Sequence, residues 1–376
     1  MSTPAPRSPR RHPRTACAAA VSAVLLATAC GTNGAAETPQ EPERATVVDE
    51  ERCATNRAIG TVTYLTGYQY QSSVSILEAV AADALGYFDR VCLDVEIVPG
   101  SGDTIGNARS VADASVQFTS LGNEGEVIQA NEQGIGIVGI ATYGHVGIAN
   151  LMTPKGVEEL TDLEGTVLGH KGMLPPPVAA MLVSEGVDLD EIEQELVGYD
   201  PSILPAGEVD SLTGYRSNEP FLLDAMDAQF IEWLPEQFGV AGSFGVMATS
   251  PDFADAHPTA VEDFLRAMAQ AFEYCQENGR ECVEYAAALD AENPESYGYD
   301  VDHNLRIWDA EQELVSSYTM EGKPLGYIDL NKTEEEAAIL EEYGQLEEIP
   351  NLEPFFRPAF IEAVHIAGEV SWPEGG

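Results

Sequence analysis

The side chains best suited to holding a small molecule lie in two short segments of this 376-residue chain. The first segment combines aromatic rings with hydrogen-bonding groups, and its candidates are Tyr68, Tyr70, Gln71 and Ser72. The second places a carboxylate among polar groups, and its candidates are Tyr215, Asn218 and Glu219. An aromatic ring can stack on a planar ligand, and a carboxylate can accept hydrogen bonds from an amine. This chemistry predicts recognition of a planar, amine-bearing compound.

Most of these candidates also have a purely structural interpretation. The tyrosines of the first segment could pack one part of the protein against another, and Glu219 could stabilise the start of a helix. Asn123 either contacts the ligand or caps the helix that follows it. Lys171 could pair with an anionic group, although a solvated lysine is more common, and Tyr143 could line a cleft where an apolar strand ends. The residue types alone leave both interpretations open.

The sequence carries no recognisable catalytic pattern. It has no G-x-S-x-G nucleophile motif, and its histidines are scattered at positions 12, 145, 170, 257, 303 and 365 without metal-site spacing. The cysteines likewise lack the spacing of an iron or zinc site. We therefore expect a binding protein that is not an enzyme and that uses no cofactor and no metal.

The elements that must position the candidates follow from the alternation of strands and helices. Strands are predicted at 60–65, 93–98, 116–120 and 135–141, with helices between them, which is typical of a mainly parallel sheet. The pattern starts again after residue 152, and the chain is largely helical beyond residue 258. We expect an α/β protein with one lobe built from residues 57–152 plus 243–376 and a second lobe from residues 153–242. The candidates then fall at strand ends, where open α/β sheets bind ligands.

The first thirty residues predict export from the cytoplasm. Four arginines precede an apolar run that is shorter than the roughly 20 residues of a membrane-spanning helix. The run ends in Leu-Ala-Thr-Ala-Cys, which resembles the bacterial lipobox, so residues 1–29 are predicted to be a signal peptide and Cys30 to be lipidated. Residues 30–56 are predicted to be a flexible tether. The alternative is an ordinary secretory peptide in which Cys30 has no role.

The remaining cysteines and the charge fit an exported binding protein. Beyond Cys30 lie Cys53, Cys92, Cys275 and Cys282, and four cysteines allow three pairings. An Asn-Gly turn between the last two favours pairing them, which would leave Cys53 to pair with Cys92.

The 63 acidic residues outnumber the 18 basic ones, giving a net charge of −45. This charge argues against nucleic acid or anionic lipid surfaces as partners, and its even spread along the chain is typical of a solvated surface.

Several short motifs together resemble the NMT1/THI5-like (SsuA/THI5-like) family of substrate-binding proteins that serve ABC importers. The motifs are Ala81-Ala82 followed by Leu85-Gly86-Tyr87-Phe88, Asp162-Leu163-Glu164-Gly165, and Tyr215 with Asn218-Glu219-Pro220. The resemblance implies a two-lobed periplasmic-binding-protein fold (type II), with a mainly parallel sheet in each lobe and a helical C-terminal tail. It also implies a small-molecule ligand, an ABC permease and ATPase complex as partners, and a monomer attached to the outer face of the cytoplasmic membrane through its lipid anchor.

The first loop departs from the pattern of the pyrimidine-binding members. Where these carry a tryptophan, an asparagine and a histidine, this chain has Tyr70, Ser73 and Ile76. A ring for stacking is kept, but the histidine is lost. The related eukaryotic enzyme that makes the thiamine pyrimidine consumes that histidine and carries a cysteine-rich iron motif, so a catalytic relative is only a remote alternative. We expect a heteroaromatic ligand such as a thiamine pyrimidine precursor. The main alternative is a sulfonate or taurine-like anion that pairs with Lys171 or Arg216.

Overall fold

Two five-stranded sheets organise the part of the chain that the computed structural model describes, which is residues 46–294, 296 and 298–372. The first sheet has the order β3 (Asp94–Val98), β1 (Thr61–Leu65), β5 (Phe118–Leu121), β12 (Phe244–Thr249), β6 (Val138–Gly144). The second has the order β11 (Phe230–Trp233), β7 (Ala149–Pro154), β10 (Ser211–Tyr215), β8 (Val167–His170), β9 (Glu193–Leu196). The predicted signal peptide and the lipidation at Cys30 lie outside the described residues.

Each sheet is mainly parallel, as predicted, because a single strand in each runs against its neighbours. That strand is β12 in the first sheet and β7 in the second. Both are the first strands formed after the chain crosses from one lobe to the other. The neighbouring pairs β1–β3 and β8–β9 show the parallel pairing of the other strands, with Thr61 opposite Asp94 and Val167 opposite Glu193.

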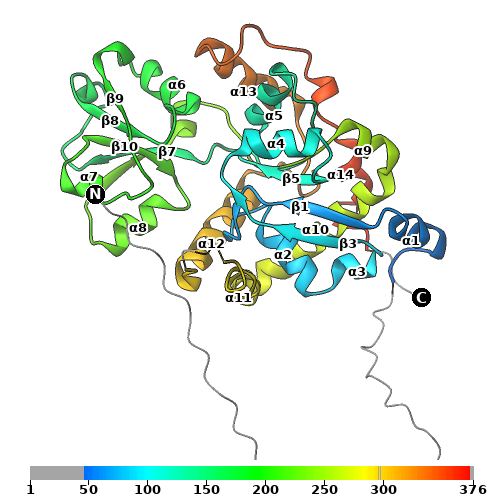
Figure 1. Ribbon diagram of the computed structural model, residues 1–376. Coiled ribbons are helices and arrows are strands. Elements are labelled where there is room, and N and C mark those ends of the chain that lie inside the picture. The colour runs from blue at the N-terminus through cyan, green and yellow to red at the C-terminus, as the bar shows by residue number, and fades with distance from the viewer. Residues whose placement is uncertain (1–45, 295, 297, 373–376) are drawn as a thin grey trace, which may run out of the picture. The chain divides into compact units, whose positions relative to one another are not determined.

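Helices cover both faces of the first sheet (Figure 1). The first lobe contains α1 (Glu50–Arg57), α2 (Leu77–Ala84), α3 (Tyr87–Arg90), α4 (Thr104–Ala112), α5 (Glu124–Glu132), α9 (Pro251–Ala256), α10 (Pro258–Glu277), α11 (Gly279–Asp290), α12 (Val301–Tyr318), α13 (Leu330–Glu342) and α14 (Ala359–Val364). The second lobe contains α6 (Pro176–Ser184), α7 (Ile203–Ala206) and α8 (Glu219–Ala225). Two small two-stranded sheets pair β2 (Tyr68–Gln69) with β4 (Gly100–Ser101) and β13 (His365–Ile366) with β14 (Glu369–Val370). The C-terminal third is helical, as predicted.

The chain enters the second lobe slightly earlier than the sequence suggested. Strand β7 begins at Ala149 and pairs only with strands of the second sheet, so the boundary predicted at residue 153 falls inside it. The outgoing crossing is therefore the segment 145–148, and the return crossing ends at Ser243, just before β12. These two segments pass so close together that a Cβ added to Gly242 would lie 2.8 Å from the Cα of Gly147.

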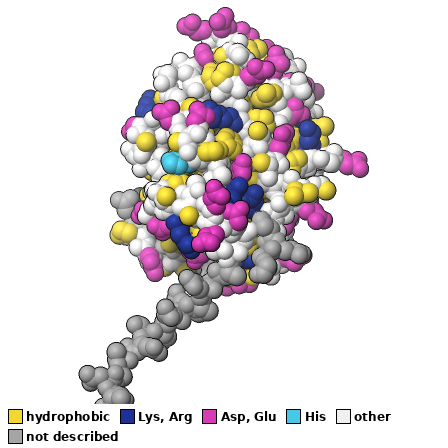
Figure 2. Space-filling view, turned by 90° about the vertical axis from the view of Figure 1, so that its right-hand side faces the viewer, with side chains coloured by type: hydrophobic (Ala, Val, Ile, Leu, Met, Phe, Trp, Pro, Cys, Tyr) yellow, Lys and Arg dark blue, Asp and Glu magenta, His cyan; other side chains and the backbone are white. Residues whose placement is uncertain are grey.

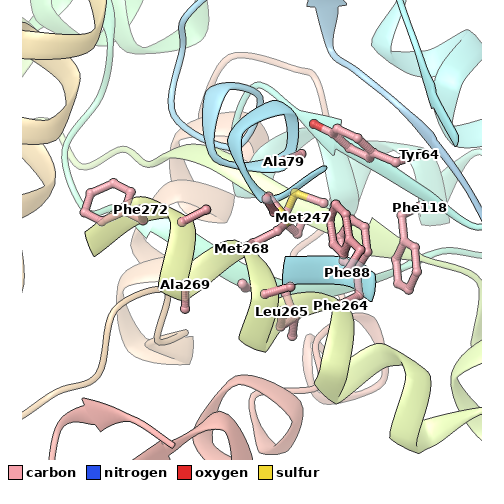
Figure 3. Packing of buried hydrophobic residues seen from close by; sticks show 14 of the residues in the cluster. Tyr64, Ala79, Phe88, Phe118, Met247, Phe264, Leu265, Met268, Ala269 and Phe272 are labelled. Carbon is pink, nitrogen blue, oxygen red and sulfur yellow. The ribbon is translucent and has the colours of Figure 1, made fainter. Parts of the chain in front are cut away.

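The core of the first lobe is built around α10, which runs beneath the first sheet. The ring of Phe264 stacks on that of Phe118 at a centroid distance of 4.1 Å and on that of Phe88 at 5.3 Å. Figure 3 shows these rings meeting between α10 and the sheet, with Tyr64 beside them. Aromatic side chains bury large apolar areas, so this cluster fixes the sheet whose strand ends carry the candidate residues.

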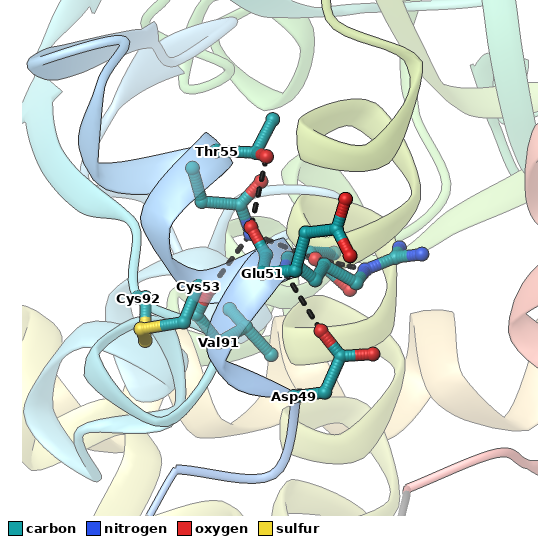
Figure 4. Close-up of a disulfide and its surroundings, with 9 residues drawn as sticks. Asp49, Glu51, Cys53, Thr55, Val91 and Cys92 are labelled. Atoms are coloured by element: carbon teal, nitrogen blue, oxygen red, sulfur yellow. Dashed lines mark hydrogen bonds and ion pairs between the residues drawn. A yellow bond between two sulfur atoms is a disulfide. The ribbon is translucent and has the colours of Figure 1, made fainter.

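Helix α1 corrects the predicted tether, which was expected to reach residue 56. Asp49 caps the helix, and Arg52 donates hydrogen bonds to the buried carboxylate of Asp263 at 2.7 and 2.9 Å. A disulfide joins Cys53 to Cys92, and Figure 4 shows it at the side of α1. These long-range contacts order a segment whose composition alone predicts flexibility. The second expected disulfide, between Cys275 and Cys282, is also present.

The acidic residues are distributed over the surface. On the face shown in Figure 2, acidic side chains are spread among apolar and uncharged ones. This pattern agrees with the prediction of a solvated acidic surface. Among the described residues, no helix is both long and apolar enough to cross a membrane.

Candidate functional site

A cavity of about 420 Å³ lies where the two lobes meet. From the first lobe it is lined by Thr104, Asn123, Glu126, Gln129, Ser243, Glu336, Ile339 and Leu340. From the crossing segments and the second lobe it is lined by Gly147, Ile148, Ala149, Lys171, Gly172, Met173, Pro175, Pro176, Pro177, Thr213, Gly214, Tyr215 and Gly242. The carboxyl ends of β8 and β10 open into it, which is where an α/β sheet is expected to bind a ligand.

The wall formed by the second lobe is organised around an ion pair. The Lys171 ammonium group pairs with the carboxylate of Glu219, which is 1% exposed. The other oxygen of Glu219 accepts a hydrogen bond from the Tyr215 backbone N–H at 2.7 Å. The Lys171 nitrogen lies 5.3 Å from the ring centroid of Tyr199 and 6.0 Å from that of Tyr215. Burial lowers the pKa of Lys171 to about 8, and Glu219 balances its positive charge.

The wall formed by the first lobe is acidic. Glu126 and Glu336 line the cavity, and Glu124 lies directly behind them. Glu336 accepts hydrogen bonds from the Gly125 N–H at 3.0 Å and from the Ser243 hydroxyl at 2.7 Å. Burial, together with the neighbouring Glu336, raises the pKa of Glu124 to about 7, and burial also raises the pKa values of Glu126 and Glu336. No lysine or arginine on this wall offsets these carboxyl groups among the described lining residues.

Four of the predicted site residues meet at this cavity. Asn123, Lys171 and Tyr215 line it, and Glu219 lies behind Lys171. Asn123 also accepts a hydrogen bond from the Glu126 N–H at 3.0 Å. It therefore caps α5, and it is also part of the cavity lining. Tyr215 is half-exposed and belongs to this lining.

Three predicted site residues are buried outside the cavity lining. Tyr70 is 5% exposed and belongs to the core of the first lobe. The Ser72 backbone N–H donates to Asn304 at 3.0 Å, and its hydroxyl contacts that of Tyr299 at 2.6 Å. Tyr143 is fully buried and stacks on Phe272. Tyr70 and Tyr143 belong to the core of the first lobe, and the polar atoms of Ser72 are hydrogen-bonded within that lobe, so these three residues have structural contacts there.

The other three predicted residues also lie outside the lining. Tyr68 belongs to the β2 strand and is 41% exposed. The Gln71 side chain accepts a hydrogen bond from the Ser73 hydroxyl at 3.1 Å. The Asn218 side chain contacts His303 at 2.8 Å. The structure therefore separates the first predicted segment from the cavity and keeps part of the second segment beside it.

The acidic wall was missed because its residues are far apart in the sequence. Glu336 lies on α13 and bonds to Gly125 across 211 positions. The acidic residues that surround it in sequence are mostly exposed, so nothing local distinguishes it. Only the packing of α13 on α5 brings the two segments together. No group of three or more His, Cys, Asp or Glu residues within the described ranges is arranged to hold a metal ion.

Comparisons with known proteins place this fold. The family model described as NMT1/THI5 like matches residues 74–282. The periplasmic sulfonate-binding protein SsuA from Methylobacillus flagellatus is 16% identical with a TM-score of 0.58, over 81% of this chain and 93% of that one. The alkanesulfonate-binding protein SsuA from Xanthomonas axonopodis pv. citri, with MOPS bound, is 12% identical with a TM-score of 0.54, over 79% and 98%. The desulfurization enzyme DSZB is 13% identical with a TM-score of 0.54, over 81% and 98%. Comparison with curated proteins found no match.

These findings establish a fold and a family. At such low identities, the solved structures show that this chain shares the periplasmic-binding-protein fold, and they show nothing about its ligand. The family match is independent of them and spans more than half of the chain, from the loop before α2 to the disulfide at Cys282. This chain therefore belongs to the NMT1/THI5-like family.

Proposed function

We propose that this protein is an extracytoplasmic solute-binding protein that captures a small, planar, amine-bearing molecule for an ABC importer. The observation that carries the proposal is the cavity at the junction of the lobes, whose lining includes an acidic wall, Tyr215 and both crossing segments. A thiamine pyrimidine precursor is a compound of this class. Its amino group would donate to Glu126 or Glu336, and its ring would lie against Tyr215.

The charge of the cavity favours an amine over an anion. Its one lysine is already paired with Glu219, whereas Glu126 and Glu336 face the space without a cationic partner in the described lining. A sulfonate entering here would find no cationic partner on this wall, and an ionised carboxylate there would repel it. An amine or ring N–H would instead form charge-assisted hydrogen bonds, which are among the stronger polar contacts in proteins.

A sulfonate is the second candidate ligand, and similar structures provide a precedent for it. Two of the similar structures are sulfonate-binding proteins. Lys171 is the residue that would pair with such an anion, after exchanging its bond to Glu219. A catalytic role, for which DSZB provides a structural precedent, would require turnover of a bound compound. Under the leading proposal the protein is a monomer anchored by lipid at Cys30 and delivers its ligand to a permease and ATPase complex.

A thermal-shift screen of the purified protein tests the ligand class. We expect 4-amino-2-methylpyrimidine to raise the melting temperature and taurine to leave it unchanged. A ligand at 100 times its Kd adds about 2.7 kcal/mol of stability, which corresponds to several degrees for a protein of this size. A shift with taurine alone would replace the leading ligand by the second candidate, and turnover of either compound would establish the enzyme.

Two variants assign the shift to the cavity. Glu126→Gln removes the charge but keeps an acceptor for the Gly122 N–H, so it should weaken aminopyrimidine binding and strengthen any binding of taurine. Tyr215→Ala should weaken aminopyrimidine binding at least tenfold. Tyr318→Ala is the matched control, because Tyr318 is a partly exposed tyrosine outside the cavity lining. Equal losses in both tyrosine variants would exclude Tyr215 as a ligand contact.

A further inference from the structure

Helix α12 joins the two lobes at a second place, outside the crossing segments. It belongs to the first lobe, yet its side chains contact the second lobe at residues 217–224. Glu311 accepts a hydrogen bond from the Ser217 hydroxyl at 2.7 Å, and His303 contacts the Asn218 side chain at 2.8 Å. Figure 1 shows α12 next to α8, the helix that contains most of these residues. We call this set of interactions the α12 contact.

Glu311 is the buried centre of the α12 contact. Glu311 is 3% exposed, and its two carboxyl oxygens accept hydrogen bonds from different lobes. One oxygen accepts from the Ser217 hydroxyl in the second lobe, and the other accepts from the Val74 backbone N–H in the first lobe at 2.7 Å. A buried carboxylate that loses its donors carries a large free-energy cost. The Glu311 side chain therefore holds Ser217 and Val74 together. Breaking either hydrogen bond would cost free energy while the carboxyl group stays buried.

The α12 contact is directly connected to the cavity through the chain. Ser217 lies between Tyr215, whose ring lines the cavity, and Glu219, which fixes Lys171. The Asn218 backbone N–H donates to the Tyr215 carbonyl at 2.9 Å, so these residues form one tight turn. A displacement of Ser217 away from the first lobe would therefore also move the ring and the ion pair of the cavity wall.

We propose that Glu311 is a positioning residue for ligand capture. It holds the turn 215–219 against the first lobe, and its bond to Ser217 breaks when the lobes separate to admit or release the ligand. The inference rests on the proposed binding function for its biological meaning. The contact itself acts on the protein without ligand, so it can be measured whether or not a ligand has been identified.

Hydrogen–deuterium exchange of the ligand-free, full-length protein tests the proposal. Glu311→Ala should increase amide exchange in residues 215–224 at least threefold, because the turn loses its tie to the first lobe. Ser217→Ala should have the same effect from the opposite lobe, and it decides the question if Glu311→Ala fails to fold. Glu311→Gln should restore slow exchange, because its amide can accept from Val74 and donate to Ser217.

A matched control separates positioning from simple stabilisation of the helix. Glu313 is exposed on the same helix, so Glu313→Ala should leave exchange in residues 215–224 unchanged. Unaltered exchange of these residues in both Glu311→Ala and Ser217→Ala would overturn the proposal. Faster exchange along α12 itself, to the same degree, would also overturn it by showing a purely structural role. Failure of every compound in the thermal-shift screen would instead count against the proposed binding function and leave this result standing.

Discussion

Lys171 and Glu219 show how a single pair of residues can serve both the structure and the cavity. Glu219 is 1% exposed, holds the Tyr215 backbone and pairs with Lys171, whose nitrogen lies between two tyrosine rings. A buried ion pair contributes modestly as a pair, but removing one partner leaves an uncompensated charge behind. The sequence offered a ligand contact and a helix-start carboxylate as separate roles for Glu219. The structure adds a third role, because the side chain neutralises the only lysine of the described cavity lining.

A double-mutant cycle measures the coupling of this pair. Glu219→Gln and Lys171→Met should each lower the free energy of unfolding, by an amount approaching the about 3–5 kcal/mol typical of a broken buried pair. The double variant should recover part of the loss, giving a coupling energy above about 1 kcal/mol. Urea denaturation of the four proteins provides the measurement. Losses that simply add would show that the pair is not coupled in solution.

At the scale of elements, the sequence predicted what local patterning controls. The strand–helix alternation predicted β1, β3, β5 and β6 of the first sheet, the helical C-terminal third and the strand ends at which Lys171 and Tyr215 lie, but it did not predict β7 or β11 of the second sheet. It failed where distant segments decide the outcome. Helix α1 is ordered by Asp263 and by the disulfide to Cys92, and the acidic wall forms only when α13 packs on α5. The burial of Tyr70 in the core was not predicted either, because the sequence does not show which side of a loop faces the core.

The crossing segments give a prediction at this scale. A Cβ on Gly242 would lie 2.8 Å from the Cα of Gly147 and 3.0 Å from its nitrogen, which is too close, whereas a Cβ on Gly147 would lie 3.9 Å from the Cα of Gly242. Neither glycine has a positive φ, so backbone strain does not enter. Gly242→Ala should therefore cost about 1–3 kcal/mol through overpacking, and Gly147→Ala should cost much less.

Thermal unfolding of the two glycine variants provides a matched comparison. Both substitutions add one methyl group to the same junction, so the difference in melting temperature isolates the close approach. We expect a drop of several degrees for Gly242→Ala and a change near zero for Gly147→Ala. Equal melting temperatures for the two variants would mean that the crossing segments are not in close contact in solution.

At the scale of the whole molecule, several buried carboxyl groups have pKa values at or above neutral pH. Burial raises the pKa of Glu78 to about 8, and burial raises the pKa of Glu311 to about 7. The pKa of Glu124 is also about 7, because of burial and the nearby Glu336. In the unfolded chain, these groups return to an ordinary pKa of about 4.3. The folded protein therefore binds more protons than the unfolded protein between these values, and its stability falls as the pH rises through the folded pKa values.

The clearest pH window for this effect is 6.5 to 8. Below this window, His145 makes stability rise with pH. Burial lowers the pKa of His145 to about 4, so the histidine of the unfolded chain binds a proton at a higher pH than the folded one does. Above the window, Lys171 also acts in the opposite sense, since its pKa of about 8 lies below the ordinary value for lysine. Within the window we expect the melting temperature to fall steadily with increasing pH.

A single substitution identifies the buried carboxyl groups as the cause of that fall. Glu78→Gln keeps an acceptor for the Ser75 N–H but cannot ionise, so its melting temperature should depend less steeply on pH. Glu284→Gln, on the exposed surface of α11, should keep the wild-type slope. Repeating the series in 1 M NaCl shortens the screening length to about 3 Å, which suppresses repulsion among the many surface acids but not the burial of Glu78. A slope that vanishes in salt, or that Glu78→Gln leaves unchanged, would assign the pH dependence to surface charge.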